Sequence, residues 1–600
     1  KFGDVKVESE LRDFDSEAMT QRLGIASGDW YDAKRIEDTV EQMTDLAGTF
    51  GYAFAEVQPQ FTRNPEDLTM DVTFTMQDAP RVYVERVDVN GNTLTQDKVV
   101  RREFRVAEGD AFNSLAIARS EARIKSLGYF QENFEITQVE GSAPDRIVLE
   151  ANVEEQPTGE LQLSAGFSSI ESFILAGSIR QRNFRGRGQT IGLGVNYSRY
   201  SKSANISFAE PYVFDRNISM GADIYHREYD NSFFTTEAFS YSQATTGGQI
   251  RLGTPLTEYM SLIGSYTLNF EDVTVGESYY ADYNGDGVAE CIGSRFLCEA
   301  IGKRTASILG LTLNYDSLDS RLRPTRGMRV SMTGEFAGLG GDVKYFRWRS
   351  NLGKYWNLGN DFIFSLTAEG GWIKALEDRN EPGIDDVRLT DRFFLGEPQF
   401  RGFDIRGVGP RVVRLNYITD TETGEQRLQT LDEIRENNNR QYDTAIGGNA
   451  YYLGRAELEI PLGSSVREMG IRPSVYVDVG SLFSVTTPIL DDYPNGIQRR
   501  EDGELLYEKP VVNDEGDVTG VEYVTDATAP DGTAYDPAII PGTQYREVFY
   551  GDSASPRISV GVGVNWNSPF GPFRIDLTHV LKKQEGDDTK TISFNVGTQF

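Results

Sequence analysis

Gln399-Phe400-Arg401-Gly402-Phe403 is the stretch around which the rest of the chain is organised, and a long irregular segment follows it. Phe400 and Phe403 favour burial, whereas the guanidinium of Arg401 needs an anionic partner. Gly402 allows the backbone to turn sharply between them. Because a loop tip in water needs none of these features, we expect the stretch to fold inward and to dock in an interior that the rest of the chain encloses.

The composition indicates many strands joined by tight turns. The 600 residues include 60 Gly, 29 Tyr and 34 Phe but only 22 Pro, and the mean hydropathy is −0.43. No apolar run approaches the ~18 residues of a membrane-spanning helix. Abundant glycine and aromatic residues suit a transmembrane β-barrel, whose strands alternate polar and apolar side chains and contain no long hydrophobic block.

The charge and the cysteines limit partners and compartment. The net charge is −31, from 91 acidic and 60 basic residues, so we expect no nucleic-acid partner. Cys291 and Cys298 lie in a polar loop, and we predict a local disulfide in an oxidising compartment, with two free thiols as the alternative. The chain opens on Lys1 without a secretion signal, so we expect that a signal was removed or that the chain is part of a longer protein.

Two similar units lead the chain, and each is predicted to contain a strand, two helices and two more strands. This self-similarity predicts a tandem repeat of α+β domains, residues 1–79 and 80–156, in which two helices cover one face of a small sheet. Their edge strands could accept a strand from a partner. In both copies Gly-Asp precedes the second helix and Gly-Tyr follows it, at Gly28-Asp29 and Gly51-Tyr52 and again at Gly109-Asp110 and Gly128-Tyr129.

From residue 157 to residue 600 the apolar pattern changes to a period of two, which predicts antiparallel strands. Their number, sixteen, is even and brings both ends of a closed sheet to the same side of a membrane. The predicted fold class is mostly β: a sixteen-stranded antiparallel transmembrane β-barrel preceded by two β-α-α-β-β domains. The predicted strands are 159–168, 172–182, 188–200, 202–210, 217–230, 236–253, 258–272, 303–315, 327–337, 343–356, 361–375, 448–460, 471–483, 555–566, 572–582 and 589–600.

The connections between these strands predict an orientation. Those after even-numbered strands are short, whereas residues 273–302, 376–447 and 484–554 form long connections after odd-numbered strands. Short periplasmic turns and long outer loops are typical of outer-membrane barrels. Because the repeats enter the barrel on the short-turn side, we expect them in the periplasm of a bacterial cell, with the barrel in the outer membrane.

The first and last predicted strands are expected to pair and to close the barrel along a lateral seam. The last strand alternates clearly, and its apolar face is suited to lipid. The seam residues are Leu161, Leu163, Ala165 and Phe167 on the first strand, and Ile592, Phe594, Val596 and the terminal Phe600 on the last, with Gly597 on the opposite face.

Several stretches accompany Phe400-Arg401-Gly402-Phe403: Asp316–Gly327 (DSLDSRLRPTRG), Gly447-Gly448-Asn449, Val475–Gly480 (VYVDVG), Gly571-Pro572-Phe573-Arg574 and the terminal aromatic residue. Together they resemble the BamA family of outer-membrane assembly factors, within the superfamily that joins POTRA domains to a barrel. The resemblance covers essentially all 600 residues. It implies that residues 1–79 and 80–156 are the penultimate and membrane-proximal POTRA domains and that residues 157–600 are the barrel.

The resemblance also implies partners for Arg401, namely Asp478 and an acid of the preceding strand, for which Glu459 fits best. A guanidinium inside a barrel needs carboxylates with matching fork geometry. Val477 and Val479 would face lipid if Asp478 faces inward. The alternative is that Asp478 is one of many polar lumen residues. We expect Arg401 to fix the loop to the wall away from the seam and to leave the seam free to move.

The resemblance implies a protein that folds and inserts β-barrel proteins into the outer membrane, without a cofactor. The seam would supply an unpaired strand edge for a client. The implied partners are unfolded outer-membrane β-barrel clients, periplasmic lipoproteins and chaperones of the assembly machinery, and outer-membrane lipid. Alternatives are a two-partner-secretion or TamA-like transporter of the same superfamily, and a passive porin, which periplasmic repeats disfavour.

Side-chain catalysis has little support in the sequence, and we expect no enzyme. His226 and His579 are far apart and have no nucleophile nearby. Residues 282–287 resemble the start of a calcium loop, but its twelfth position is Gly293 where the loop requires Glu, so no metal site is predicted, with a weak surface ion site as the alternative.

Overall fold

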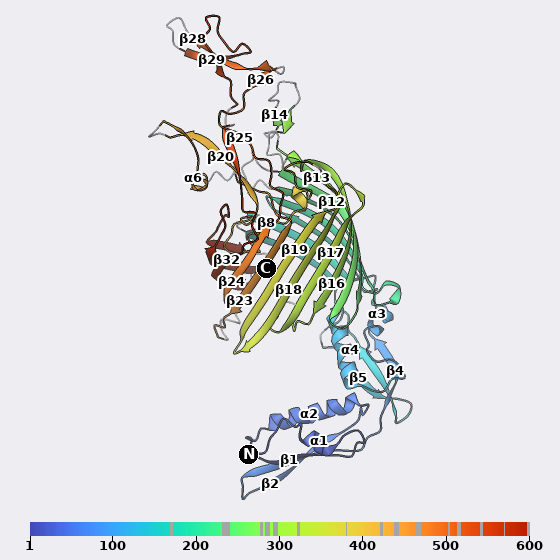
Figure 1. Cartoon of the computed structure of the whole chain (residues 1–600). Helices are drawn as coiled ribbons and strands as arrows, with labels where there is room; N and C mark the ends of the chain where they lie inside the picture. Colours follow the sequence, from blue (N-terminus) through green and yellow to red (C-terminus); the bar gives the residue numbers. More distant parts are fainter. Residues whose placement is uncertain are drawn as a thin grey trace. The chain divides into compact units, whose positions relative to one another are not determined.

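The computed structural model comprises two compact units, Lys1–Glu160 with Arg180–Ile191, and Leu161–Ile179 with Gly192–Phe600 (Figure 1). The described residues are all except 132, 169–171, 231–240, 277–279, 282–288, 292–297, 321–323, 380, 421–423, 437–442, 464–469, 502–503, 513–517, 541–543, 569–570 and 597–600.

The first unit contains the predicted repeat as two copies of one small fold. Each copy has a three-stranded sheet in which the first strand lies parallel to the last, with orders β1-β3-β2 and β4-β6-β5. The first copy comprises β1 (Phe2–Ser9), α1 (Ser16–Thr20), α2 (Ala33–Thr49), β2 (Val57–Asn64) and β3 (Thr69–Met76). The second comprises β4 (Tyr83–Asn90), α3 (Asp97–Arg101), α4 (Ser114–Ser126), β5 (Ile136–Glu140) and β6 (Arg146–Asn152).

The longer helix of each copy begins and ends at comparable residues. The side chain of Asp32 accepts a hydrogen bond at the start of α2, and that of Asn113 does so at the start of α4. Gly51 and Gly128 follow the helices with φ of 100° and 66°, values that favour glycine. Each copy encloses its own buried apolar core, so each repeat is stabilised by its own packing.

The second repeat packs against the first short turn of the barrel sheet, Asn183–Gly188, within the same unit. The amide of Asn183 donates to Thr95 Oγ1 over 2.8 Å, and Gln96 N donates to Gly186 O over 2.9 Å. Tyr129 donates its hydroxyl to Gly188 O. A Cβ at Gly186 would overlap the carbonyl group of Leu94, so the close approach of the two backbones requires glycine there.

The predicted sixteen-stranded barrel is confirmed among the described residues. The strands close in the order β10-β11-β12-β13-β16-β17-β18-β19-β23-β24-β32-β33-β34-β7-β8-β9. Each predicted range overlaps one of them: β7 (Gly159–Ser168), β8 (Ser172–Phe184), β9 (Gln189–Tyr197), β10 (Ser201–Glu210), β11 (Ser219–Asp230), β12 (Tyr241–Pro255), β13 (Met260–Val275), β16 (Gly302–Asp316), β17 (Gly327–Gly341), β18 (Tyr345–Gly359), β19 (Phe362–Ala375), β23 (Ala450–Glu459), β24 (Ile471–Phe483), β32 (Arg557–Ser568), β33 (Gly571–Lys582) and β34 (Ile592–Val596).

The barrel wall shows the alternation that the sequence predicts. Ile250, Tyr266 and Leu309 are cross-strand neighbours on three successive strands, and all three side chains are exposed on the outer face. The residues between them point inward, where Gln249 donates to Thr267 Oγ1 over 2.9 Å. No described helix is long and apolar enough to span a membrane.

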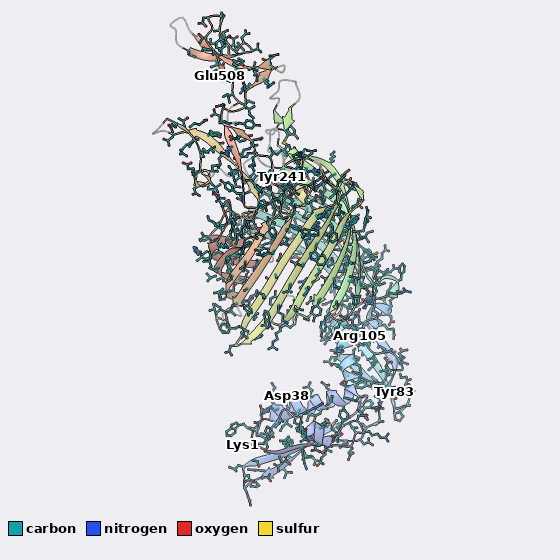
Figure 2. The ribbon with its side chains drawn as sticks, viewed as in Figure 1. Lys1, Asp38, Tyr83, Arg105, Tyr241 and Glu508 are labelled. Atoms are coloured by element: carbon teal, nitrogen blue, oxygen red, sulfur yellow. A yellow bond between two sulfur atoms is a disulfide. The ribbon has the colours of Figure 1, made fainter. Side chains whose placement is uncertain are left out.

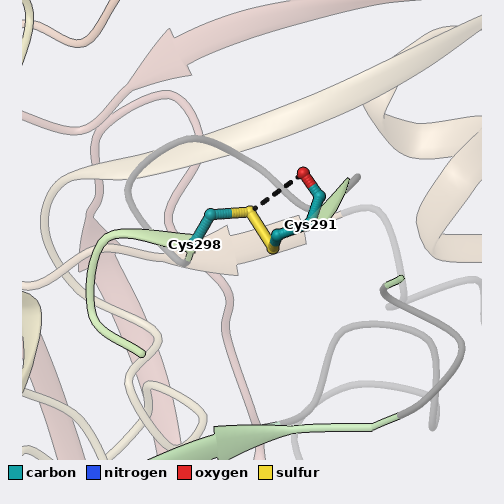
Figure 3. Close-up of a disulfide and its surroundings, with 2 residues drawn as sticks. All are labelled: Cys291 and Cys298. Atoms are coloured by element: carbon teal, nitrogen blue, oxygen red, sulfur yellow. Dashed lines mark hydrogen bonds between the residues drawn. A yellow bond between two sulfur atoms is a disulfide. The ribbon is translucent and has the colours of Figure 1, made fainter. Parts of the chain in front are cut away.

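The long connections carry structure of their own. Figure 2 shows Tyr241 at the start of β12 and Glu508 within an outer sheet. Cys291 and Cys298 form a disulfide with an S–S distance of 2.06 Å (Figure 3). The outer elements are β14 (Tyr280–Ala281), β15 (Glu290–Cys291), β20 (Arg411–Thr419), β21 (Gln426–Leu428), α6 (Leu431–Glu436), β22 (Asp443–Ala445), β25 (Asp492–Tyr493), β26 (Arg500–Glu501), β27 (Glu504–Leu505), β28 (Tyr507–Val512), β29 (Val518–Val524), β30 (Asp536–Pro537) and β31 (Tyr545–Tyr550).

Candidate functional site

Arg401 lies inside the barrel and its side chain is 3% exposed. Its Nε and Nη2 donate to the two carboxylate oxygens of Asp478 over 2.8 and 2.6 Å, a two-bond fork that matches the planar guanidinium. Its Nη1 donates to Glu457 Oε2 over 2.9 Å. The guanidinium also lies 3.3 Å from the ring centre of Tyr476. The arginine is thus held by groups from β23 and β24.

The acid on β23 that binds Arg401 is Glu457, so the prediction of Glu459 was wrong. In the strand register Glu457 lies opposite Tyr476 and Glu459 lies opposite Ser474. Both acids belong to the same face of β23, but Glu459 is about 7 Å farther along the strand. Its carboxylate lies 3.7 Å from Arg472 instead.

Two further arginines complete the cluster around Arg401. Arg455 lies 3.4 Å from Asp478, and its guanidinium also donates to Gln399 O. Arg574 Nε donates to Asp576 Oδ2 over 2.7 Å and its Nη2 lies 3.7 Å from Glu457. Except for Arg574, which lies in a matching stretch, these residues were missed. The sequence signal that could have identified them is the presence of charged residues at inward-facing positions of neighbouring strands.

The rest of the stretch is buried against the same wall. Phe400 and Phe403 are fully buried, with ring centres 4.6 Å apart. Gly402 has a φ of +88°, and a Cβ there would lie 2.6 Å from Thr578 Cγ2. Ser559 Oγ donates to Arg401 O over 2.6 Å. The loop therefore rests closely on β32 and β33 as well as on β23 and β24.

This placement corrects the expectation that Arg401 fixes the wall away from the seam. The strands that hold the stretch follow one another as β23-β24-β32-β33, and β33 pairs directly with β34, the last strand. The parity of the strands predicted the side of the membrane from which the loop enters. It carried no information on which wall the loop contacts.

The loop also pairs with the segment that leads into β34. Lys590 N donates to Gly402 O over 3.0 Å, and Asp404 N donates to Asp588 O over 3.0 Å. Asp588 N donates to Gly407 O over 2.8 Å. The start of the last strand is therefore bonded to the docked loop through main-chain groups.

The seam between β34 and β7 closes the barrel. Among the described residues, Asn595 pairs with Ser168 and Val596 with Phe167. On the first strand Leu161, Leu163, Ala165 and Phe167 are exposed, and on the last strand Ile592 and Phe594 are exposed. Gly597 and Phe600 lie outside the described residues.

The two histidines lie on different barrel strands. His226 is on β11, with Nδ1 2.8 Å from Thr246 Oγ1, and His579 is on β33. The segment that resembles a calcium loop, 282–287, and Gly293 lie outside the described residues. Within the described part of the chain, no group of three or more His, Cys, Asp or Glu side chains is arranged to hold a metal ion.

Comparisons with known proteins agree with this architecture. The family model of the Omp85 superfamily domain matches residues 183–600, and the POTRA model, described as a surface antigen variable number repeat, matches residues 1–77 and 82–156. The outer membrane protein assembly factor BamA of Neisseria meningitidis serogroup B is 24% identical over 612 residues, covering 100% of this chain and 67% of that protein. BamA of Neorickettsia risticii is 26% identical over 601 residues, covering 100% and 66%.

The chain thus spans about two thirds of the length of these curated relatives. A solved structure, BamA from Haemophilus ducreyi lacking POTRA domains 1-3, superposes with a TM-score of 0.66 at 22% identity and covers 100% of both chains.

Proposed function

Because the chain belongs to the Omp85 superfamily, we propose that it folds and inserts β-barrel proteins into the bacterial outer membrane. The barrel, residues 157–600, spans that membrane, and the repeats, residues 1–79 and 80–156, are POTRA domains in the periplasm. The names of the curated relatives, outer membrane protein assembly factors, support this function.

The observation that carries the proposal is that the first and last barrel strands, β7 and β34, pair with each other, so the two ends of the sheet meet at this seam. A barrel protects its backbone groups only where neighbouring strands are paired along their length. Where the two strands part, their free N–H and C=O groups offer an edge to which an unfolded client strand can add. Burial of the client's own apolar face in lipid then drives the reaction, so the mechanism requires no nucleotide.

Arg401 contributes by holding the loop against the wall that ends in β34. The edges that separate are formed by Leu161, Leu163, Ala165 and Phe167 on the first strand and by Ile592, Phe594 and Val596 on the last. The repeats bind periplasmic lipoproteins, chaperones and unfolded clients, since their edge strands remain open to strand addition. Outer-membrane lipid surrounds the exposed apolar wall.

A reversible lock on the seam tests this function. In a chain with Cys291→Ser and Cys298→Ser, the pair Phe167→Cys and Val596→Cys places two thiols at directly paired positions. The protein is reconstituted in liposomes with an unfolded barrel client, and insertion is followed by the client's protection from protease. We expect oxidation to stop insertion and a reductant to restore it.

The matched control locks a pair of strands away from the seam. Val564 on β32 and Ile575 on β33 are directly paired and both exposed, so Val564→Cys with Ile575→Cys adds the same crosslink elsewhere. This lock should leave insertion unchanged. Undiminished insertion by the oxidised seam variant would overturn the proposed mechanism.

A further inference from the structure

Arg557, at the start of β32, is a fully buried arginine outside the Arg401 cluster. Its Nε and Nη2 donate to the two carboxylate oxygens of Asp587 over 3.0 and 3.2 Å. Its Nη1 donates to Ser481 Oγ over 2.7 Å and to Ser553 O over 2.6 Å, and its Nη2 also donates to Gly551 O over 2.8 Å. Every part of the guanidinium is therefore engaged.

These contacts join three segments that are distant in the sequence. Ser481 lies on β24, Gly551 and Ser553 lie in the connection before β32, and Asp587 lies in the turn before β34. Asp587 is itself fully buried and also accepts a hydrogen bond from Gln584 N over 2.6 Å. The turn is thus closed on its own backbone and anchored to the barrel wall through the Asp587 carboxylate, while Arg435 donates to the carbonyl oxygens of Gly586 and Asp587.

The anchored carboxylate directly precedes the segment that pairs with the docked loop. Asp588 and Lys590 make main-chain bonds to Gly407 and Gly402, and β34 begins at Ile592. The entry to the last strand is consequently fixed from two sides, by Arg557 through Asp587 and by the loop through the following residues. A buried ion pair contributes little net stability but specifies one arrangement, because either member left alone would be an unpaired buried charge.

The segment that leads into β34 is relevant to how β34 aligns with β33. Phe594 lies opposite Ile575, and Ile592 lies opposite Leu577. A slip of two residues would keep every side chain on its present face, so burial alone opposes it weakly. Such a slip would, however, change the length of the turn that contains Asp587.

We infer that Arg557 and Asp587 are positioning residues that set the register of the last strand, and with it the register of the edge offered to a client. The part concerning the client rests on the function proposed above. The part concerning the register of β34 against β33 is a property of the chain itself and can be measured without a client.

Paired cysteines report the register directly. In the chain with Cys291→Ser and Cys298→Ser, Ile575→Cys is combined with Phe594→Cys for the observed register, and with Ile592→Cys or Val596→Cys for a slip of two residues in either direction. With Arg557 and Asp587 present, we expect the Phe594 pair to oxidise fastest. With Asp587→Asn we expect that pair to lose crosslinking and one of the slipped pairs to gain it.

Two further variants keep the test decisive. Ser481→Ala serves as a milder variant in case Asp587→Asn folds poorly. It removes one acceptor of Arg557 but leaves the ion pair, so it should produce a smaller shift of the β34 register. Arg546→Met, at an exposed arginine 3.7 Å from Asp492, is the matched control and should change nothing. An unchanged crosslinking pattern in Asp587→Asn, with the barrel still resistant to unfolding in detergent, would overturn the inference.

Client insertion separates this inference from the proposed function. If Asp587→Asn shifts the register and slows insertion, both stand. If the register shifts but the unmodified chain inserts no client, the function fails and the role of Asp587 in the register remains. If the unmodified chain inserts clients and Asp587→Asn neither shifts the register nor slows insertion, only the positioning role fails.

Discussion

Arg401 and Asp478, 77 residues apart in the chain, meet inside the barrel with Nη2 and Oδ1 2.6 Å apart. The aspartate is fully buried, and it accepts two side-chain bonds from the same guanidinium. Arg455 of the wall also lies 3.4 Å from this carboxylate, but the forked pair of bonds to Arg401 exists only while the loop is docked. The pair therefore links the conformation of a long outer loop to the integrity of the barrel wall.

Arg401→Ala should destabilise the barrel by about 3–5 kcal/mol, because it removes the cation that bonds both Asp478 and Glu457 and leaves these buried carboxylates with the longer contacts to Arg455 and Arg574. The temperature at which the barrel unfolds in detergent, followed by the change in gel mobility, measures the effect. Arg427→Ala is the control, since Arg427 pairs with Glu433 on the exposed surface and should contribute little. Equal unfolding temperatures for Arg401→Ala and the unmodified chain would show that the pair does not support the wall.

Glu457→Gln should lower the unfolding temperature more than Glu459→Gln. Glu457 accepts bonds from Arg401 and from Ser474 Oγ at 2.6 Å, whereas the ion pair of Glu459 with Arg472 is longer and more exposed. The same substitution on one face of one strand makes the two variants closely matched. A larger effect at Glu459 would contradict the placement of the loop described above.

Gly402→Ala should release the loop from the wall. The new Cβ would overlap the side chain of Thr578. The alanine would also have to adopt a φ of +88°, a conformation that costs residues other than glycine roughly 1–2 kcal/mol. Gly463→Ala separates these causes, since Gly463 has a φ of +89° and no atom of the described residues lies within 4 Å of its Cβ position. Hydrogen exchange of the Asp404, Asp588 and Lys590 amides measures docking. Faster exchange is expected only in Gly402→Ala.

The contact between the second repeat and the barrel turn should weaken in acid, because Glu155 holds the segment whose Thr95 and Gln96 bond to that turn. Burial raises the pKa of Glu155, but hydrogen bonds from Thr95, Thr93 and the amides of Leu94 and Thr95 outweigh it and lower the pKa from 4.5 to about 2. A carboxylate with a depressed pKa in the folded state stabilises that state above its ordinary pKa and loses the effect as the pH falls toward 2.

Hydrogen exchange of residues 93–96, corrected for its intrinsic pH dependence, checks this prediction. Protection should fall between pH 4.5 and about 2 in the unmodified chain. Glu155→Gln should show lower protection at neutral pH and no such transition. A transition of the same size in Glu155→Gln would assign the acid sensitivity to another group.

Alternation and loop lengths were enough to predict the strands, because lipid on one face and polar groups on the other impose a period of two on every strand. The pairing of Arg401 with Asp478 came from the resemblance together with the need of a buried guanidinium for a carboxylate. Alternation assigns a residue to a face of a strand but not to a position along it, which is why Glu459 was predicted where the structure has Glu457. The ion pair of Arg557 and Asp587 joins the start of β32 to the turn before β34, and no local pattern in the sequence marks that contact.

The formal charges of the six side chains in the Arg401 cluster sum to zero, although the whole chain carries −31. The members are Arg401, Arg455 and Arg574 with Glu457, Asp478 and Asp576. A neutral, enclosed cluster recruits no counterions, and dissolved salt screens buried pairs far less than surface ones. The docked loop should consequently be insensitive to the ionic strength of the surroundings, while the acidic outer loops respond to it strongly.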